Sequence, residues 1–500
     1  MSRFQRTVIF ALLYATRGLR KLIVASPWLA SKLLRRGHEG TLWRIGEWRA
    51  WLAFERAVAD VPAYADFVRE HGGEVTAKRW KPDFSHVPVT TKENYVRRYS
   101  VEERCAGGQL PLRGAVIDES SGTSGEPTNW VRGPDERQDA RKLLHIGVHR
   151  TLGTRPFFVI NAFALGPWAT GMAISMSIVD IAVLKSTGPD VAKIEKTLEL
   201  FGPRYHYLVC GYPPFLKALV DQSSLDWSAY ECTAAVGGEG MSEALRDHLR
   251  RAFGEVYSSF GASDLEINIA TENDFTIAFR RLLLQRDDLR EALRLPDHGS
   301  APMVFQYNPL DYLIEVNDED ELVITICRLD TTAPKLRYCI HDLGCVRRFP
   351  EVSAVLAAVG VHPSSLSPDW IDLPLLFHYG RSDATVAFYG ANLPVADVEE
   401  AVFSVAGLGD RVASFMLIAG EDEQANKTLD LAFELAEAAD APEDVRDRLL
   451  ARLSELNPDW REASRFMPAA QPTLSFHAFG TGPFAGYDPR LKRQYVRPSA

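Results

Sequence analysis

Apolar and polar positions alternate in two ways along this 500-residue chain, and each way predicts a different kind of element. Residues 41–70 carry large apolar side chains at helical spacing, which predicts a helix that is interrupted at Val61-Pro62-Ala63-Tyr64. From about 114 to 375, short apolar runs alternate with helical stretches. The runs lie at 157–160, 178–184, 207–210, 233–236 and 256–260. This rhythm predicts an α/β fold with mostly parallel sheets.

Two later regions follow other patterns. Residues 312–316 and 322–327 are strand-like runs joined by an acidic turn, which predicts a hairpin in a small β subdomain. After Arg381 the pattern restarts with a short strand, and the further predicted elements are a helix over 394–405, a strand over 412–418 and a helix over 433–456. The chain is also too long for one core.

We therefore predict a large N-terminal domain over 1–380, and a small, mobile α+β C-terminal domain over 381–500. Residues 1–40 are basic and amphipathic, and they predict a helical extension of the first domain. Docking of this extension on the protein surface is the first interpretation. A helix lying in a membrane interface and a cleaved signal peptide are the alternatives.

Composition narrows the possible partners. A net charge of −10 argues against nucleic acid as the main partner, so an anionic ligand would need local positive groups. The six cysteines form no CxxC pair, which predicts reduced thiols in a cytoplasmic protein, with membrane association as an alternative. No apolar segment is long enough to span a bilayer. The oligomeric state does not follow from the sequence.

A loop rich in glycine and hydroxyl side chains follows an apolar run at 114–117. It consists of Ser120-Ser121-Gly122-Thr123-Ser124-Gly125-Glu126-Pro127-Thr128. Glycine lets consecutive N–H groups turn inward and form a nest for anions, and the hydroxyls add donors. The loop therefore predicts a phosphate site, with an ordinary polar turn as the alternative. Glu126 stands where a Walker-type loop has lysine.

Four further fragments follow this loop in a fixed order. They are Gly237-Gly238-Glu239-Gly240, Phe260-Gly261-Ala262-Ser263-Asp264, Leu336-Arg337-Tyr338-Cys339-Ile340-His341-Asp342 and Gly380-Arg381-Ser382-Asp383. Together the fragments resemble the core motifs of the adenylate-forming enzymes, the superfamily of acyl-CoA ligases, peptide-synthetase adenylation domains and luciferases. Within it, the chain most resembles the phenylacetate–coenzyme A ligase branch, through residues 61–64, 88–92 and 334–338.

The resemblance implies an AMP-forming carboxylate ligase. Such an enzyme activates a small carboxylic acid with ATP and Mg²⁺ as an acyl-adenylate, and then transfers the acyl group to coenzyme A. Two alternatives stay open. One is transfer to an amine or a carrier-protein thiol, and the other is a nucleotide-binding protein without turnover.

The resemblance also implies roles for particular residues. The nucleotide would contact Ser120, Ser121, Gly122, Thr123, Ser124, Gly125, Thr128, Gly238, Glu239, Phe260, Gly261, Ala262, Ser263, Asp342 and Arg381. Asp342 would accept hydrogen bonds from the ribose hydroxyls, and His341 replaces the usual glycine before it. Arg381 and Lys492 would be catalytic, while Asp383 would lie at the hinge between the domains.

Metal and acyl sites complete the expectations. Asp264 stands where the family usually has glutamate and would hold Mg²⁺, with Glu266 as a possible substitute and a helix cap as the alternative role. Residues 267–293 contain no cysteine or histidine, so no zinc is expected of the kind some members of the branch hold there. The acyl pocket would include Phe163, Ala164, Gly166 and Trp168, with ordinary core packing as the alternative.

Overall fold

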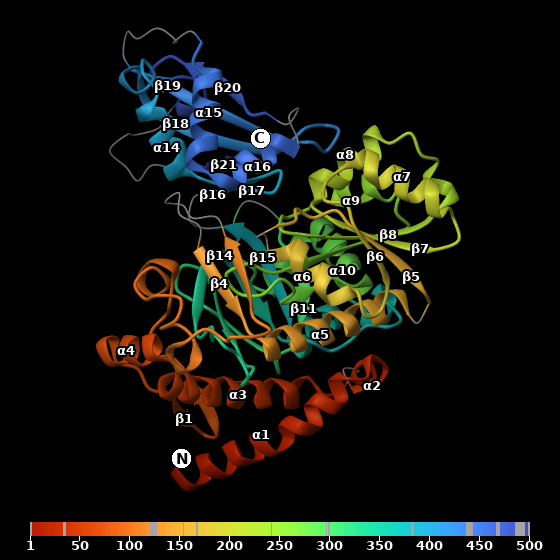
Figure 1. Cartoon of the computed structure of the whole chain (residues 1–500), viewed down its shortest axis with the longest axis vertical. Helices are drawn as coiled ribbons and strands as arrows, with labels where there is room; N and C mark the ends of the chain where they lie inside the picture. The colour runs from red at the N-terminus through yellow and green to blue at the C-terminus, as the bar shows by residue number, and fades with distance from the viewer. Residues whose placement is uncertain are drawn as a thin grey trace.

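The computed structural model describes most of the chain. The described residues are 3–33, 37–120, 128–153, 155–166, 169–241, 243–296, 298, 301–381, 385–436, 444–466, 471–485 and 496–498. Figure 1 shows the C-terminal strands and helices at the top, the large sheet in the middle and the N-terminal helices below it.

One sheet of eleven strands organises the body. Its strands are β5 (Phe157–Asn161), β6 (Val183–Ser186), β7 (His206–Gly211), β8 (Glu231–Gly237), β9 (Glu255–Phe260), β10 (Ala270–Thr271), β11 (Met303–Tyr307), β12 (Tyr312–Val316), β13 (Glu321–Ile326), β14 (Tyr338–Arg347) and β15 (Leu375–Arg381). Their spatial order is β12-β13-β14-β15-β11-β10-β9-β8-β7-β5-β6.

The α/β class is confirmed, although the sheet is mixed. Strands β6, β5, β7, β8 and β9, in spatial order, pair in parallel. From β9 onward, the neighbouring strands β10, β11, β15, β14, β13 and β12 pair antiparallel. The expectation of mostly parallel sheets is therefore right for one half only. The predicted hairpin exists as β12 and β13, but it extends the large sheet through β14 instead of forming a subdomain of its own. A hairpin can be predicted from the local sequence pattern. The strand that pairs with the hairpin in the sheet depends on residues far away in the sequence.

Helices cover both faces of the parallel half. They are α5 (Pro134–Leu152), α6 (Ala169–Ile178), α7 (Val191–Phe201), α8 (Pro213–Gln222) and α9 (Glu243–Leu249). Along β5, Phe158 and Ile160 pack with the core of α7, α8 and α9, while Phe157 and Val159 pack with α5 and α6. A strand buried on both faces needs apolar residues at every position, which explains the unbroken apolar runs in the sequence.

The remaining helices and short hairpins complete the body. These are α1 (Arg3–Val24), α2 (Pro27–Leu33), α3 (Glu39–Asp60), α4 (Pro62–His71), α10 (Asp274–Gln285), α11 (Asp287–Ala292), α12 (Phe349–Ala358) and α13 (Pro363–Leu366), with the short hairpins β1 (Thr76–Lys78) and β2 (Lys81–Asp83), and β3 (Val116–Ser120) and β4 (Thr128–Arg132). The interruption predicted near Pro62 is confirmed, because Pro62 begins α4.

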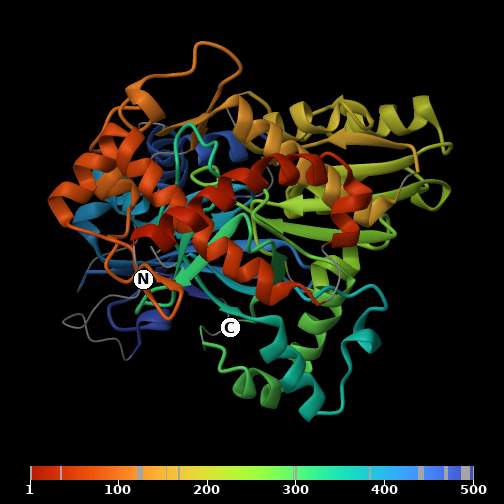
Figure 2. The ribbon, with the colours of Figure 1, turned by 90° about the horizontal axis from the view of Figure 1, so that it is seen from below.

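Helix α1 is docked on the body, as Figure 2 shows from below. Arg20 lies 2.8 Å from Asp139 and 2.6 Å from Asp311, so α1 is tied to α5 and to the turn before β12. The opposite side of α1 exposes an apolar stripe, in which Leu12 and Leu22 are 59% and 71% exposed. None of the helices in the described ranges is both long and apolar enough to cross a membrane.

Residues after 385 form a second sheet with its own core. The elements are β16 (Thr385–Phe388), β17 (Ala391–Pro394), α14 (Val395–Ser404), β18 (Val412–Glu421), β19 (Lys427–Leu435), α15 (Arg446–Leu456), α16 (Pro458–Phe466), β20 (Thr473–His477) and β21 (Val496–Pro498). Four of them form the sheet β20-β19-β18-β21. The predicted helix over 433–456 is wrong at its start, because β19 runs to Leu435 and α15 begins at Arg446. Leu429, Leu431 and Phe433 alternate into the core, a period of two that the acidic composition obscures.

Candidate functional site

A cavity of about 1670 Å³ lies where the parallel strands of the body end. Its walls include Gly237 at the end of β8, Phe260 at the end of β9 and Arg381 at the end of β15. Tyr389 and Lys427 of the C-terminal region line the same cavity. Ligands of open α/β sheets bind at this edge, outside the carboxyl ends of the strands.

The predicted phosphate loop connects two strands beside this cavity. Strands β3 and β4 pair antiparallel, with Ser120 opposite Thr128. Val116, Asp118 and Arg132 of these strands line the cavity. Ser121, Gly122, Thr123, Ser124, Gly125 and Glu126 lie outside the described residues.

The segment from Phe260 to Asp264 also lines the cavity. A Cβ atom on Gly261 would lie 2.2 Å from the carbonyl oxygen of Ile267, so only glycine allows the chain to turn this tightly. Ala262 and Ser263 follow it along the cavity wall. The structure thus brings the predicted fragment 260–264 to the same edge of the sheet as the predicted fragment 237–240.

Asp264 faces a lysine that sequence reasoning did not assign to the site. Lys92 Nζ lies 3.3 Å from Asp264 Oδ2, and the Tyr338 hydroxyl donates to the same oxygen at 3.2 Å. Lys92 also lines the cavity, so it supplies a local positive charge within an acidic protein. The motif at 88–92 contained this residue, but its distance in sequence from residue 264 hid the contact.

Glu266 does not fit the substitute role considered for it. Its two carboxylate oxygens bind Arg328 and the Tyr312 hydroxyl, and all three side chains are buried. Both oxygens of Glu266 are therefore engaged, whereas the contacts of Asp264 with Lys92 and Tyr338 both fall on Oδ2.

Asp342 and Arg381 are brought together by strand pairing. They are direct partners across β14 and β15, although they are far apart in sequence. Asp342 is 6% exposed, and its Oδ2 lies 3.2 Å from His378 Nε2. Both strands are irregular here, and β15 has one extra residue, Tyr379, opposite the step from Leu343 to Gly344. Such a bulge re-aims side chains, and it brings His378 to Asp342.

His378 is a second site residue that the motifs did not indicate. Its ring centroid lies 4.7 Å from that of Phe260, with the planes inclined by 43°. The imidazole therefore joins Phe260, on β9, to Asp342, on β14, along the cavity wall. A regular strand would not predict this position, because the bulge changes which residues of β15 share a face.

Glu239 contacts the C-terminal region in this structure. Its Oε1 accepts a hydrogen bond from the Gly390 N–H, and Gly390 also lies against the Tyr212 ring. Burial raises the pKa of Glu239 to about 7, while the charge of Lys427 opposes the shift. Gly238 has φ of 85°, a conformation that favours glycine. Both Gly238 and Glu239 line the cavity.

Two of the four residues predicted for the acyl pocket, Phe163 and Ala164, line this cavity. Phe163 is buried, and its ring centroid lies 4.9 Å from that of Tyr212 in a T-shaped arrangement. Gly166 does not line the cavity, and Trp168 lies outside the described residues. Apolar residues of α5 and α6 that were not predicted continue the same wall, namely Leu143, Leu144, Val148, Met172, Ile174 and Met176.

Two remaining candidates, Lys492 and Asp383, lie outside the described residues. Lys427 is the lysine of the C-terminal region that the structure describes. It lines the cavity, and its Nζ lies 4.0 Å from Glu421 Oε1.

The mixed body sheet and the smaller C-terminal sheet form a fold that the chain shares with solved structures. The chain is similar to a solved 2-hydroxyisobutyryl-CoA ligase in complex with 2-HIB-AMP and CoA, in its thioester-forming state. The two share 16% identity over 91% of this chain and 88% of that chain, with a TM-score of 0.60. At this identity the likeness concerns the fold.

Other conformations of that ligase superpose less closely. Its postadenylation state in complex with R3-HIB-AMP gives a TM-score of 0.52 at 15% identity, over 91% of this chain and 89% of that chain. An open conformation gives 0.50 at 16% identity, over 91% and 90%. No protein-family model and no curated protein matches the sequence.

Proposed function

We propose that the chain activates a carboxylic acid with ATP as an acyl-adenylate and transfers the acyl group to coenzyme A. The proposal rests on one observation. A single cavity is lined by residues from distant parts of the sequence, namely Gly238, Phe260, Asp264, Asp342 and Arg381. Its volume of about 1670 Å³ exceeds the roughly 300–1,000 Å³ of a site for one small ligand.

Each polar residue then has a role that suits its chemistry. The buried Asp342 carboxylate is an acceptor for the ribose hydroxyls, and Arg381 beside it is a donor for ribose or phosphate oxygens. Lys92 and Arg381 supply positive charge where pyrophosphate leaves. Asp264 offers one carboxylate oxygen to Mg²⁺, which would neutralise the phosphates when bound.

The acid we propose has an apolar body. The wall formed by α5, α6 and Phe163 includes leucine, methionine and isoleucine side chains beside charged ones such as Arg137 and Arg141, and its apolar part favours an aryl or branched aliphatic group. Such a substrate is compatible with the phenylacetate–coenzyme A ligase branch that the motifs resemble. We keep that branch as part of the proposal.

Coenzyme A is the proposed acceptor because of the arrangement of the two parts. This choice is supported by the TM-score, which is higher for the thioester-forming state of the ligase solved with 2-HIB-AMP and CoA than for its postadenylation or open state. In such enzymes, rotation of this region gates the second step without performing chemistry itself. An amine acceptor or a carrier-protein thiol would use the same adenylate.

The first experiment measures pyrophosphate release from ATP and Mg²⁺ with a panel of aryl and aliphatic acids. Acid-dependent release, with a hydroxamate formed when hydroxylamine is added, supports adenylation. Adding coenzyme A, amines or a carrier protein separately then identifies the acceptor. ATP binding without release for any acid would instead support a nucleotide-binding protein without turnover.

A second experiment tests Lys492. We expect Lys492→Ala to slow adenylation while leaving ATP affinity nearly unchanged, because this lysine would stabilise only the transition state. Lys427→Ala is the matched control, since Lys427 is the preceding lysine in the sequence and lines the cavity in the observed arrangement. An unchanged adenylation rate in Lys492→Ala would remove that residue from the mechanism.

A further inference from the structure

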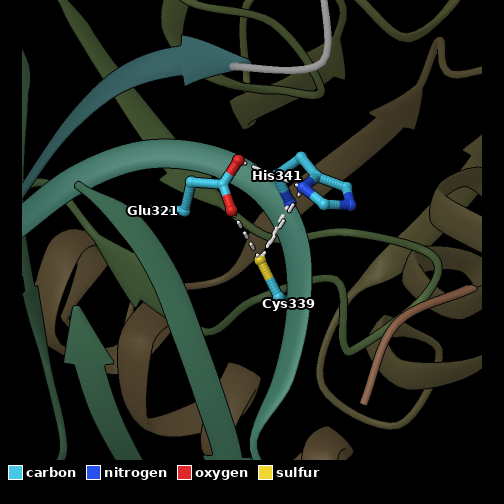
Figure 3. Close-up of side chains that lie close together, drawn as sticks. All are labelled: Glu321, Cys339 and His341. Carbon is cyan, nitrogen blue, oxygen red and sulfur yellow. Dashed lines mark hydrogen bonds and ion pairs between the residues drawn. The ribbon is translucent and has the colours of Figure 1, made fainter. Parts of the chain in front are cut away.

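Three side chains that bind metal ions in many proteins meet at the beginning of β14. Glu321 begins β13, and Cys339 and His341 lie near the start of β14. Figure 3 shows the carboxylate, the thiol and the imidazole pointing toward one another. Among the described residues this is the group of acidic, cysteine and histidine side chains whose ligand atoms all lie within 4.8 Å of one another.

An irregularity in strand pairing produces this arrangement. Glu321 pairs with Leu343 and Val323 pairs with Cys339, so two steps along β13 are opposed by four along β14. The extra residues include His341, whose φ of 63° lies in the left-handed region. Backbone in this region favours glycine, so a histidine must be held there by its own contacts. The bulge places its ring beside Glu321.

The distances match a metal site with a thiolate, an imidazole and a carboxylate. Cys339 Sγ lies 3.4 Å from Glu321 Oε2 and 4.0 Å from His341 Nδ1, while His341 Nδ1 lies 3.1 Å from Glu321 Oε1. Bond lengths of about 2.3 Å to sulfur and about 2.0 Å to nitrogen and oxygen place tetrahedral zinc ligands about 3.3–3.6 Å apart. Sγ and Nδ1 therefore need to approach each other by a few tenths of an ångström, and the Glu321 carboxylate must turn, because Cys339 and His341 contact different oxygens of it.

The surroundings also suit a bound cation. Cys339 is buried, and the carboxylate of Glu321 is largely shielded, with its side chain 13% exposed. Asn317 Nδ2 donates to Glu321 Oε2 at 3.0 Å and thereby orients the carboxylate. Outer partners of this kind fix the direction of a metal ligand. His341 is 34% exposed, which leaves a route for the ion and for a water molecule.

We propose that Glu321, Cys339 and His341 bind one Zn²⁺ ion. Cys339 binds as a thiolate after its proton passes to solvent, His341 binds through Nδ1 with its proton on Nε2, and water takes the fourth position. The mixed ligand set of sulfur, nitrogen and oxygen selects Zn²⁺ over Mg²⁺ or Ca²⁺, which prefer oxygen ligands. The site differs from the zinc cluster considered at 267–293, and it ties β13 to the bulge immediately before Asp342.

Metal titration of the full-length chain tests this proposal without any assay of catalysis. The purified protein is stripped with a chelator, dialysed, and loaded with Zn²⁺ or Co²⁺. We expect one Zn²⁺ retained per chain, and a Co²⁺ spectrum with a thiolate charge-transfer band. Cys339→Ser should abolish that band, and His341→Gly should weaken Zn²⁺ binding by more than the about 10–100-fold contributed by outer partners.

Two features of the chain provide controls for this experiment. Cys345 is buried on the same strand but outside the group, so Cys345→Ser should keep the metal and the band. His341→Gly suits the observed φ of 63°, so it should fold, and its circular dichroism spectrum checks this. A chain that retains less than one Zn²⁺, or a Co²⁺ spectrum without a thiolate band in the unaltered protein, would reduce the group to a hydrogen-bonded cluster. Retention by Cys339→Ser and His341→Gly would place the ion elsewhere.

Discussion

The two walls of the cavity are held in different ways. On the body side, strand pairing sets Asp342 beside Arg381, and Glu266, which is paired with the buried Arg328, also lines the cavity. On the opposite side, Gly390 meets the body through its hydrogen bond to Glu239 and its contact with the Tyr212 ring. The body wall is part of the main sheet, whereas the wall from the C-terminal region contacts the body through Gly390.

This difference separates binding from movement. Strand register is costly to change, so residues on the body wall should keep their positions during the proposed rotation of the opposite wall. Contacts such as that of Glu239 with Gly390 can be broken and remade, as the proposed rotation requires. Substitutions on the two walls should therefore have different effects.

The largest effect is expected in the supporting layer of the body wall. Glu266→Ala leaves the Arg328 guanidinium buried without its carboxylate, which should lower the free energy of unfolding by about 3–5 kcal/mol. Urea denaturation measures this change. Asp264→Ala is the matched control two residues away, and it should cost about 1 kcal/mol, because Lys92 still faces the cavity. Equal losses in the two variants would show that Glu266 does not support this wall.

The next effect concerns the wall surface. Asp342→Asn keeps the side-chain shape but weakens two proposed hydrogen bonds to ribose, so kcat/KM for ATP should fall about 100-fold. Pyrophosphate release with varied ATP measures it, and stability should change little. Normal ATP kinetics in this variant would exclude Asp342 from ribose binding.

The smallest effect concerns the movable wall and depends on pH. Burial raises the pKa of Glu239 to about 7 from an ordinary value of 4.5, so the neutral acid is the form favoured when Gly390 is docked. Docking should be fully supported below pH 4.5 and should weaken as pH rises through the raised pKa, about 7. The docking equilibrium should therefore change by about tenfold or more across this range.

Small-angle X-ray scattering from pH 5 to 8 measures this opening as an increase in the radius of gyration. Glu239→Gln cannot ionise, so its radius should not follow this titration. A pH profile that is the same in both proteins would assign the movement to other groups.

The sequence allowed the body wall to be predicted better than its neighbours. Asp342 and Arg381 were assigned because each lies in a short fragment whose order along the chain is informative. His378 and Lys92 were missed because their roles depend on a bulge in β15 and on a contact between residues 92 and 264. Such three-dimensional contacts leave no periodic signal in a single sequence.

The fold, like the site, could be predicted only where a local sequence pattern determines the structure. Apolar runs revealed the parallel strands, since burial on both faces demands such runs. The start of the last predicted helix was wrong, because strand β19 owes its state to pairing with β18 and β20 rather than to local preference. The exposed stripe of α1 stays compatible with surface docking alone and with membrane contact, and vesicle sedimentation would distinguish them.

The pairing of β15 with β14 also limits how this protein can vary through evolution. Because Tyr379 is the extra residue of the bulge, deleting it would restore regular pairing and leave Arg381 opposite Asp342, whereas inserting one more residue beside it would move Arg381 opposite His341. Insertions just after residue 385 would leave this register intact. Homologous chains should therefore tolerate the loss of one residue between the positions of His378 and Arg381 better than a gain, while their connections to the C-terminal region can differ in length.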